Sequence, residues 1–266
     1  MTFQSVSSNI KPIAIAGLMA KGIVYSLVGV FAFMAAFEIA GQSTGDADRE
    51  GVFSFIQNQM GGQVMLAVIA LGLLCYSLWR GLQAFKDTEH KGSDAKGLST
   101  RALYLVSGLF YTSIAFFIFK MLFGINKNSG NNQQNMVQDL LAKSYGQWLV
   151  GIAAAVMFIV GLYQVWYGLS GKYKEHVSRA GGTRNERLLV ASGKVGYAAR
   201  GVVWLIIGWM FSKAAFYSDA AQAGDTSKAF AFLEDGASGS YLLGAVGFGF
   251  LCYGFFNFIR VRYETF

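Results

Sequence analysis

Three polar side chains occupy the same position in three similar apolar segments of the chain. They are Arg80, Gln164 and Asn257, and each lies eighteen residues after a glycine that opens its segment. At 1.5 Å per residue, this spacing places all three about 27 Å along their helices, and therefore at one depth. Because polar groups are costly in lipid, a ring of them around a pseudo-threefold axis would form the constriction of a solute path. A second interpretation stays open, in which Arg80 extends toward the headgroups and the two amides bond to nearby backbone.

Three further cations, Lys21, Arg101 and Arg200, lie near the expected cytoplasmic starts of apolar segments. Long basic side chains at such positions commonly reach the lipid headgroups, and we expect all three to be interface anchors. Arg101 has an alternative, because it occupies the position held by Gly22 and Gly201 in the other segments and could point into the bundle. We favour the anchor.

The chain lacks the residue patterns of the common enzyme sites. Its two histidines, His90 and His176, each end a Lys-x-x-Glu-His pattern in an expected cytoplasmic link, which is more typical of a repeat than of a metal or haem site. No catalytic acid pair, phosphate-binding loop, metalloprotease helix or nucleophile elbow is present. Cys75 and Cys252 share a repeat position with Ile159, which indicates packing more than a disulfide or metal pair. We expect no enzyme activity, no cofactor and no metal.

The composition is that of an integral membrane protein. Hydrophobic residues make up 54% of the 266 residues, charged residues make up 14%, and the mean hydropathy is +0.40. A helix needs about 20 apolar residues to cross the hydrocarbon core, and runs of about this length recur along the chain. We predict an all-α protein with six transmembrane helices. The runs are 22–40, 62–85, 102–124, 147–170, 201–217 and 240–259, of which 201–217 is short and needs flanking residues.

Two residue patterns indicate that the chain consists of three repeats. In the first, an aromatic residue lies four positions before a glycine, and Ala-Phe begins seven positions after it. In the second, a glycine opens an apolar run that carries an aromatic residue at plus seventeen and the polar residue described above. Each repeat is a two-helix unit, and three units predict a pseudo-threefold arrangement. We place the repeats at 1–90, 91–180 and 181–266, within a single membrane domain.

Short amphipathic stretches at 52–56, 136–141 and 229–233 precede the second helix of each repeat. They predict helices of one or two turns that lie on the outer membrane surface. Such helices serve either as a lid that packs the mouth of each two-helix unit or as a gate, and we favour the lid.

Small residues recur at intervals of seven along the first helix of each repeat. Because seven residues make two helical turns, each set lies on one stripe that lets another helix approach closely. We predict that Gly29 and Gly208 lie against a neighbouring helix. The stripes are Gly22, Gly29 and Ala36 in repeat 1, Gly108 and Ala115 in repeat 2, and Gly201, Gly208 and Ala215 in repeat 3.

The basic residues predict the orientation in the membrane. The two termini and the links 80–101 and 172–200 hold 16 of the 22 lysines and arginines. The positive-inside rule therefore places both termini in the cytoplasm. The net charge of +7 fits this topology and contact with anionic headgroups, whereas the dispersed basic residues argue against nucleic-acid binding.

Three tandem two-helix units, the link Asp87–Leu98 and the helix entry Gly196–Leu205 resemble the bacterial family called domain of unknown function 1206. The resemblance covers essentially the whole chain. It implies a six-span protein of the bacterial inner membrane, and it brings no activity, cofactor or catalytic residue with it. Repeat 2 departs most from the pattern, because it lacks the Arg200-Gly201 pair of repeat 3.

Two classes of function remain. We favour a transporter or channel for a small solute or ion, because repeats of the same orientation generate an axis along the membrane normal where a path can run. The alternative is a non-transporting accessory or scaffold protein whose helix faces bind partner helices or lipids.

Overall fold

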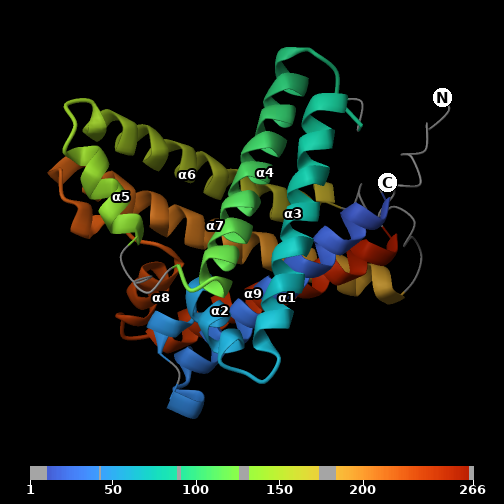
Figure 1. The fold of residues 1–266 in the computed structure, drawn as a ribbon, viewed down its shortest axis with the longest axis horizontal. Coiled ribbons are helices and arrows are strands. Elements are labelled where there is room, and N and C mark those ends of the chain that lie inside the picture. Colours follow the sequence, from blue (N-terminus) through green and yellow to red (C-terminus); the bar gives the residue numbers. More distant parts are fainter. Residues whose placement is uncertain (1–10, 42, 89–90, 126–131, 174–183, 264–266) are drawn as a thin grey trace.

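The computed structural model of the chain describes residues 11–41, 43–88, 91–125, 132–173 and 184–263, which form helices joined by short connections (Figure 1). Six of these helices are long and apolar enough to cross a membrane. The predicted all-α fold with six helices of membrane-spanning length is therefore confirmed. The long helices are α1 (Lys11–Ala36), α3 (Gly62–Lys86), α4 (Ala95–Leu122), α6 (Gly146–Ser170), α7 (Arg184–Tyr217) and α9 (Gly239–Tyr263).

Two of the long helices start well before the apolar runs that the sequence predicted. α1 begins at Lys11 rather than at residue 22, and α7 begins at Arg184 rather than at residue 201. α7 thereby reaches 34 residues, which removes the shortfall expected of the run 201–217. Helix formation depends on backbone propensity and packing, so a helix continues through polar residues that end a hydropathy run.

A short helix precedes the second long helix of each repeat, as the amphipathic stretches predicted. Asp48 caps the first of these helices and Asp225 caps the last, and each carboxylate accepts a hydrogen bond from a backbone N–H of the first turn. Their apolar faces are buried against the long helices, as at Phe53 and Phe230. The short helices are α2 (Arg49–Gln57), α5 (Asn132–Leu141) and α8 (Thr226–Glu234).

Hydrogen bonds join the three loops that carry the short helices. The Ser227 hydroxyl of α8 donates to the Thr44 carbonyl at 3.2 Å, in the one-turn helix η2 (Thr44–Asp46). The Gln134 amide of α5 donates to the Ala221 carbonyl at 3.3 Å, in the one-turn helix η4 (Ala220–Gln222). The loops of all three repeats therefore form one connected cover.

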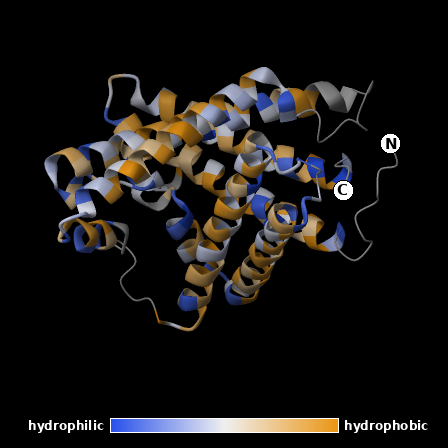
Figure 2. Cartoon of the chain, turned by 90° about the horizontal axis from the view of Figure 1, so that it is seen from above, coloured by the Kyte–Doolittle hydropathy of each residue, from blue (hydrophilic) through white to orange (hydrophobic). Residues whose placement is uncertain are grey.

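The long helices pair mainly between repeats. α3 packs along α4, α6 along α7, and α9 along α1, so each pair joins the second helix of one repeat to the first helix of another. Within repeats 1 and 3, α1 packs on α3 and α7 packs on α9. In repeat 2, α4 and α6 do not pack along each other, and the α3–α4 pair diverges from the α6–α7 pair (Figures 1 and 2). The ring of helices that a threefold arrangement requires is therefore open at repeat 2.

Glycines explain why the two long helices pack on each other in repeat 1 and in repeat 3. A Cβ atom on Gly17 would lie 2.6 Å from the Cα of Tyr76, and a Cβ atom on Gly196 would lie 2.7 Å from the Cα of Tyr253. Only a residue without a side chain lets these helix backbones approach so closely. Repeat 2 has Lys96 at the corresponding position.

A second close contact shows the same difference between the repeats. A Cβ atom on Gly72 would lie 2.5 Å from the Cβ of Ala20, and Gly249 packs equally closely against Ala199. Repeat 2 has Val156 at the position of these two glycines. Because the lysine and the valine fill the space that the glycines leave free, α4 and α6 cannot pack as the other two repeats do.

The small-residue stripes lie in the contacts between repeats. A Cβ atom on Gly29 would lie 2.6 Å from the backbone nitrogen of Leu251 in α9, and one on Gly208 would lie 3.2 Å from that of Phe158 in α6. Both glycines therefore face a helix of another repeat rather than of their own. The rest of the stripes are also packed: Gly22 faces Phe258, Gly201 faces Val165, Gly108 faces Ser77, and Ala36, Ala115 and Ala215 are buried.

Candidate functional site

Lys21 is buried among aromatic rings. Its side chain is 4% exposed, and its ammonium donates a hydrogen bond to the Tyr76 hydroxyl at 3.2 Å. The ring centres of Tyr76, Tyr111 and Tyr253 lie 4.8, 5.1 and 5.2 Å from Nζ, within the range of cation–π attraction. The expectation that Lys21 anchors α1 among the headgroups is therefore wrong. The hydropathy run suggested a helix start, but α1 has already made about three turns between Lys11 and Lys21.

Arg200 holds the repeat position that corresponds to Lys21. Its guanidinium lies over the rings of Tyr25 and Tyr253, with the ring centres at 4.7 and 4.3 Å. These rings belong to α1 and α9, so the side chain points into the bundle. The expectation of a headgroup anchor is wrong here as well, because α7 extends 16 residues before Arg200, from its start at Arg184.

Arg101 differs from the other two cations. Its Nε donates to the Ala84 carbonyl at 2.7 Å, and its Nη2 donates to the Phe85 carbonyl at 3.2 Å. These carbonyls belong to the last turn of α3, where backbone acceptors lack partners within the helix. Arg101 therefore binds a helix end, which agrees with an anchoring role and disagrees with a side chain directed into the bundle.

The polar layer does not form a shared constriction. Arg80 donates from Nε to the Tyr76 hydroxyl at 2.8 Å and from Nη1 to Gln83 Oε1 at 2.7 Å, both within α3. Asn257 donates from Nδ2 to the Tyr253 carbonyl at 2.6 Å, within α9. Gln164 and Asn257 are buried, and each keeps a side-chain oxygen without a hydrogen-bond partner among the described residues. The second interpretation, in which Arg80 extends toward the headgroups, is not supported either. Its guanidinium lies over the rings of Tyr76 in α3 and Tyr104 in α4.

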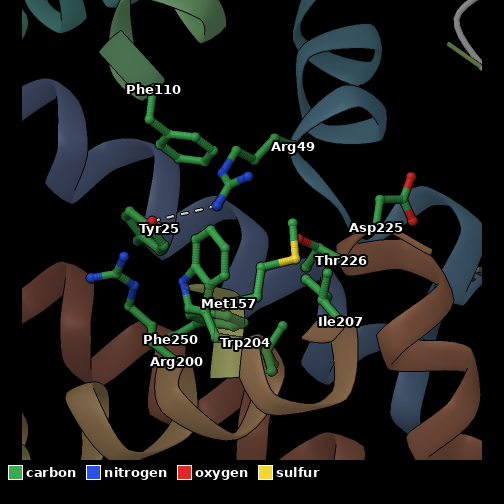
Figure 3. A pocket seen from close by; sticks show the side chains of 11 residues that line it. Tyr25, Arg49, Phe110, Met157, Arg200, Trp204, Ile207, Asp225, Thr226 and Phe250 are labelled. Atoms are coloured by element: carbon green, nitrogen blue, oxygen red, sulfur yellow. Dashed lines mark hydrogen bonds between the residues drawn. The ribbon is translucent and has the colours of Figure 1, made fainter. Parts of the chain in front are cut away.

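A cavity of about 130 Å³ lies beneath the short helices α2 and α8, and α1, α4, α6, α7 and α9 also contribute to its walls (Figure 3). Two arginines line it. Arg49 enters from the start of α2 and donates from Nη2 to the Tyr25 hydroxyl at 3.4 Å. Arg200 enters from α7, and both guanidiniums contact the ring of Tyr25. Asp225 lies at another part of the wall, and among the described residues it forms no ion pair with either arginine.

Carboxyl groups gather beside Arg49 at the cover. Burial raises the pKa of Asp48 from 3.8 to about 6. Burial also raises the pKa of Glu50 from 4.5 to about 7, and the neighbouring charges of Asp48 and Asp225 add to the shift. Proton uptake at the cover is therefore expected near neutral pH.

Sequence reasoning missed several residues of this site. Arg49 and Asp225 have the appearance of ordinary polar loop residues, and only the fold brings them to the cavity. Tyr25 and Trp204 did carry a signal, because they are the aromatic residues of the first repeat pattern. That pattern was assigned to architecture alone.

Other sequence candidates take no part in the cavity. Cys75 and Cys252 are free thiols with part-buried side chains. No group of three His, Cys, Asp or Glu residues that could hold a metal occurs among the residues that the structure describes. His90 and His176 lie outside the described residues.

Comparisons with known proteins identify relatives without an assigned activity. The chain is similar to "Uncharacterized protein YxxB" of Bacillus subtilis (strain 168), with 29% identity over 251 residues that cover 93% of this chain and 89% of that protein. No solved structure matches the chain. The model of the family described as Domain of Unknown Function (DUF1206) matches residues 16–87, 102–171 and 195–264, one stretch for each repeat. The chain therefore belongs to this family, as the resemblance predicted, and it is built of three tandem repeats.

Proposed function

We propose that the protein binds a small anionic solute in its central cavity and moves it across the membrane. The observation that supports this most is the environment of Arg200. Its guanidinium lines the cavity, and its contacts among the described residues are aromatic rings, with no acidic side chain and no hydrogen-bond acceptor. Because a guanidinium has five N–H donors and stays charged, a bound anion would supply the acceptors that the protein does not.

Arg49 adds a second positive charge to the same cavity. It flanks the Tyr25 ring together with Arg200, and the Tyr25 hydroxyl accepts its one hydrogen bond among the described residues. Asp48 and Glu50 lie beside Arg49, but burial raises the pKa values of both, so protonation reduces the negative charge that they bring near neutral pH. The residues that line the space of about 130 Å³ are charged at two cations and at one carboxylate, that of Asp225, which leaves the lining with a surplus of positive charge. Such a surplus at low dielectric favours small anions over cations.

Movement of the cover would give the anion access to the cavity. α2 and α8 border the cavity, and the loops are joined by hydrogen bonds from Ser227 to the carbonyls of Thr44 and Gly45. The cover also buries Phe53 and Phe230, so its opening in a transport cycle is a local rearrangement with an energetic cost. In this proposal the cover faces the outside of the bacterial inner membrane and both termini lie in the cytoplasm.

Anion binding can be tested on the purified protein by its thermal stability in detergent. A ligand that binds the folded state raises Tm in proportion to its concentration and affinity. We expect chloride, phosphate or sulfate, each at constant ionic strength, to raise the Tm of the wild type. Arg200→Gln should abolish this shift, whereas the exposed Arg262→Gln should keep it. Liposome flux of the stabilising anion then tests transport. An equal anion-dependent shift in Arg200→Gln would contradict the proposal.

One observation favours the alternative of an accessory protein. α4 and α6 do not pack on each other, and both expose large apolar side chains such as Leu109 and Ile159. A partner helix could cover these faces. A photo-crosslinker at position 159 distinguishes the two functions in cells, because a single crosslinked protein supports the scaffold and lipid adducts alone speak against it.

A further inference from the structure

We infer that the anion carries a hydrocarbon chain, and that this chain leaves the cavity between α4 and α6. The inference rests on the proposed function and names its class of solute. The ligand would be an anionic amphiphile whose headgroup lies at Arg200 and Arg49. Its chain would run sideways into the bilayer, on the side where the ring of helices is open.

The cavity wall on that side is apolar and comes from the two helices that do not pack. Phe110 is the contribution of α4 and Met157 is the contribution of α6 (Figure 3). Both side chains are only half-buried. Trp204 of α7 lies beside them, with its ring centre 6.0 Å from that of Phe110. The Arg49 guanidinium lies 5.2 Å from the ring centre of Phe110, so the cations directly adjoin this hydrocarbon wall, as the headgroup of an amphiphile adjoins its chain.

The repeats show that the opening is a property of the sequence. Repeats 1 and 3 each place a cation and a tyrosine at equivalent positions, as Lys21 with Tyr76 and Arg200 with Tyr253. Repeat 2 has Thr100 and Val160 at these positions. It thus lacks the cation–tyrosine pair as well as the close-packing glycines, and the residues that repeat 2 contributes to the cavity wall, Phe110 and Met157, are uncharged.

The physical environment determines what can fill this opening. Beyond Phe110 and Met157 lie the lipid-facing surfaces of α4 and α6, with exposed residues such as Val106 and Ile152. Water and polar solutes are disfavoured at this depth, whereas a hydrocarbon chain passes from bilayer to cavity without desolvation. An anion with a tail can therefore reach Arg200 from the membrane, and an anion without one depends on the cover.

Fluorescence quenching of Trp204 can detect such a ligand. The probe is an alkyl sulfate with bromine at the end of its chain, and the corresponding bromoalkanol is the neutral control with the same partitioning. Protein in nanodiscs should show saturable quenching by the sulfate beyond that by the alcohol. This difference should vanish in Trp204→Phe. Arg200→Gln should weaken the sulfate roughly tenfold to a hundredfold, as expected for the loss of a charged hydrogen-bonding partner.

A second variant tests the binding of the ligand's hydrocarbon chain separately from the binding of its headgroup. It also keeps the inference testable if Arg200→Gln fails to fold. Met157→Trp fills the lateral wall, and we expect it to weaken the bromoalkyl sulfate while the Tm shift with inorganic sulfate stays unchanged. Ile159→Trp, on the exposed face of the same helix, should change neither. If inorganic sulfate stabilises the protein through Arg200 but the alkyl sulfate quenches no more than the alcohol, the inference of an amphiphilic ligand is refuted. The proposed binding of an anion at Arg200 is then still supported. If neither ligand depends on Arg200, the proposed function fails.

Discussion

Replacement of Gly29 by alanine tests the packing that holds repeats 1 and 3 together. The added Cβ atom would lie 2.6 Å from the backbone nitrogen of Leu251 and 2.8 Å from the Gly247 carbonyl oxygen. Atoms in favourable contact are about 3.5–4.0 Å apart, so α1 and α9 would have to separate by about 1 Å. Both obstructing atoms belong to backbone and cannot rotate away. Overpacking of this kind costs about 1–3 kcal/mol.

Gly81→Ala is the matched control, because a Cβ atom on this helical glycine of α3 meets nothing within 4 Å. Both substitutions gain the same helix propensity of about 1 kcal/mol, so their difference isolates the packing cost. We expect Gly29→Ala to melt below Gly81→Ala by roughly 2–12 °C in detergent, at about 2–4 °C per kcal/mol. Equal melting temperatures, or a more stable Gly29→Ala, would refute the close contact of α1 with α9.

Three further predictions concern the cover, the topology and a helix end. The raised pKa of Glu50 means that its protonated form favours the folded state, so its contribution to stability is full below pH 4.5 and is lost as the pH rises to about 7. Glu50→Gln should flatten this part of the Tm-against-pH curve, and an unchanged curve would refute the assignment. Cysteine at the exposed position Ser43 should react with an impermeant maleimide added to intact cells, and failure to label would refute the proposed orientation. Arg101→Gln removes two charged hydrogen bonds from the end of α3 and should cost about 1–2 kcal/mol, with Arg262→Gln as the neutral comparison.

The sequence by itself determined the architecture at the level of the single helix. Apolar runs of membrane length, glycines at intervals of seven and two repeated patterns are local properties of the chain, and they predicted six long helices and three repeats. The resemblance to the family was carried by these units together with the link Asp87–Leu98 and the entry Gly196–Leu205. The amphipathic stretches likewise predicted α2, α5 and α8, because helical periodicity is read within one segment. The predicted helix starts were less accurate, because an apolar run ends at a polar residue whereas a helix can continue through it.

Only the tertiary structure decided which faces meet. Lys21 and Arg200 appeared to mark membrane interfaces, but aromatic rings from α3, α4 and α9 surround Lys21, and rings from α1 and α9 flank Arg200. These contacts cannot be read from local sequence patterns, because residues 53 to 232 positions apart in the chain supply them. Arg49 reaches the cavity for the same reason, through the placement of α2 over α1. The open side of repeat 2 follows from Lys96 and Val156, whose effect depends on how closely two backbones approach elsewhere in the bundle, at Gly17 and Gly72. A glycine is informative about packing only when the helix opposite it is known, and the fold supplies that helix.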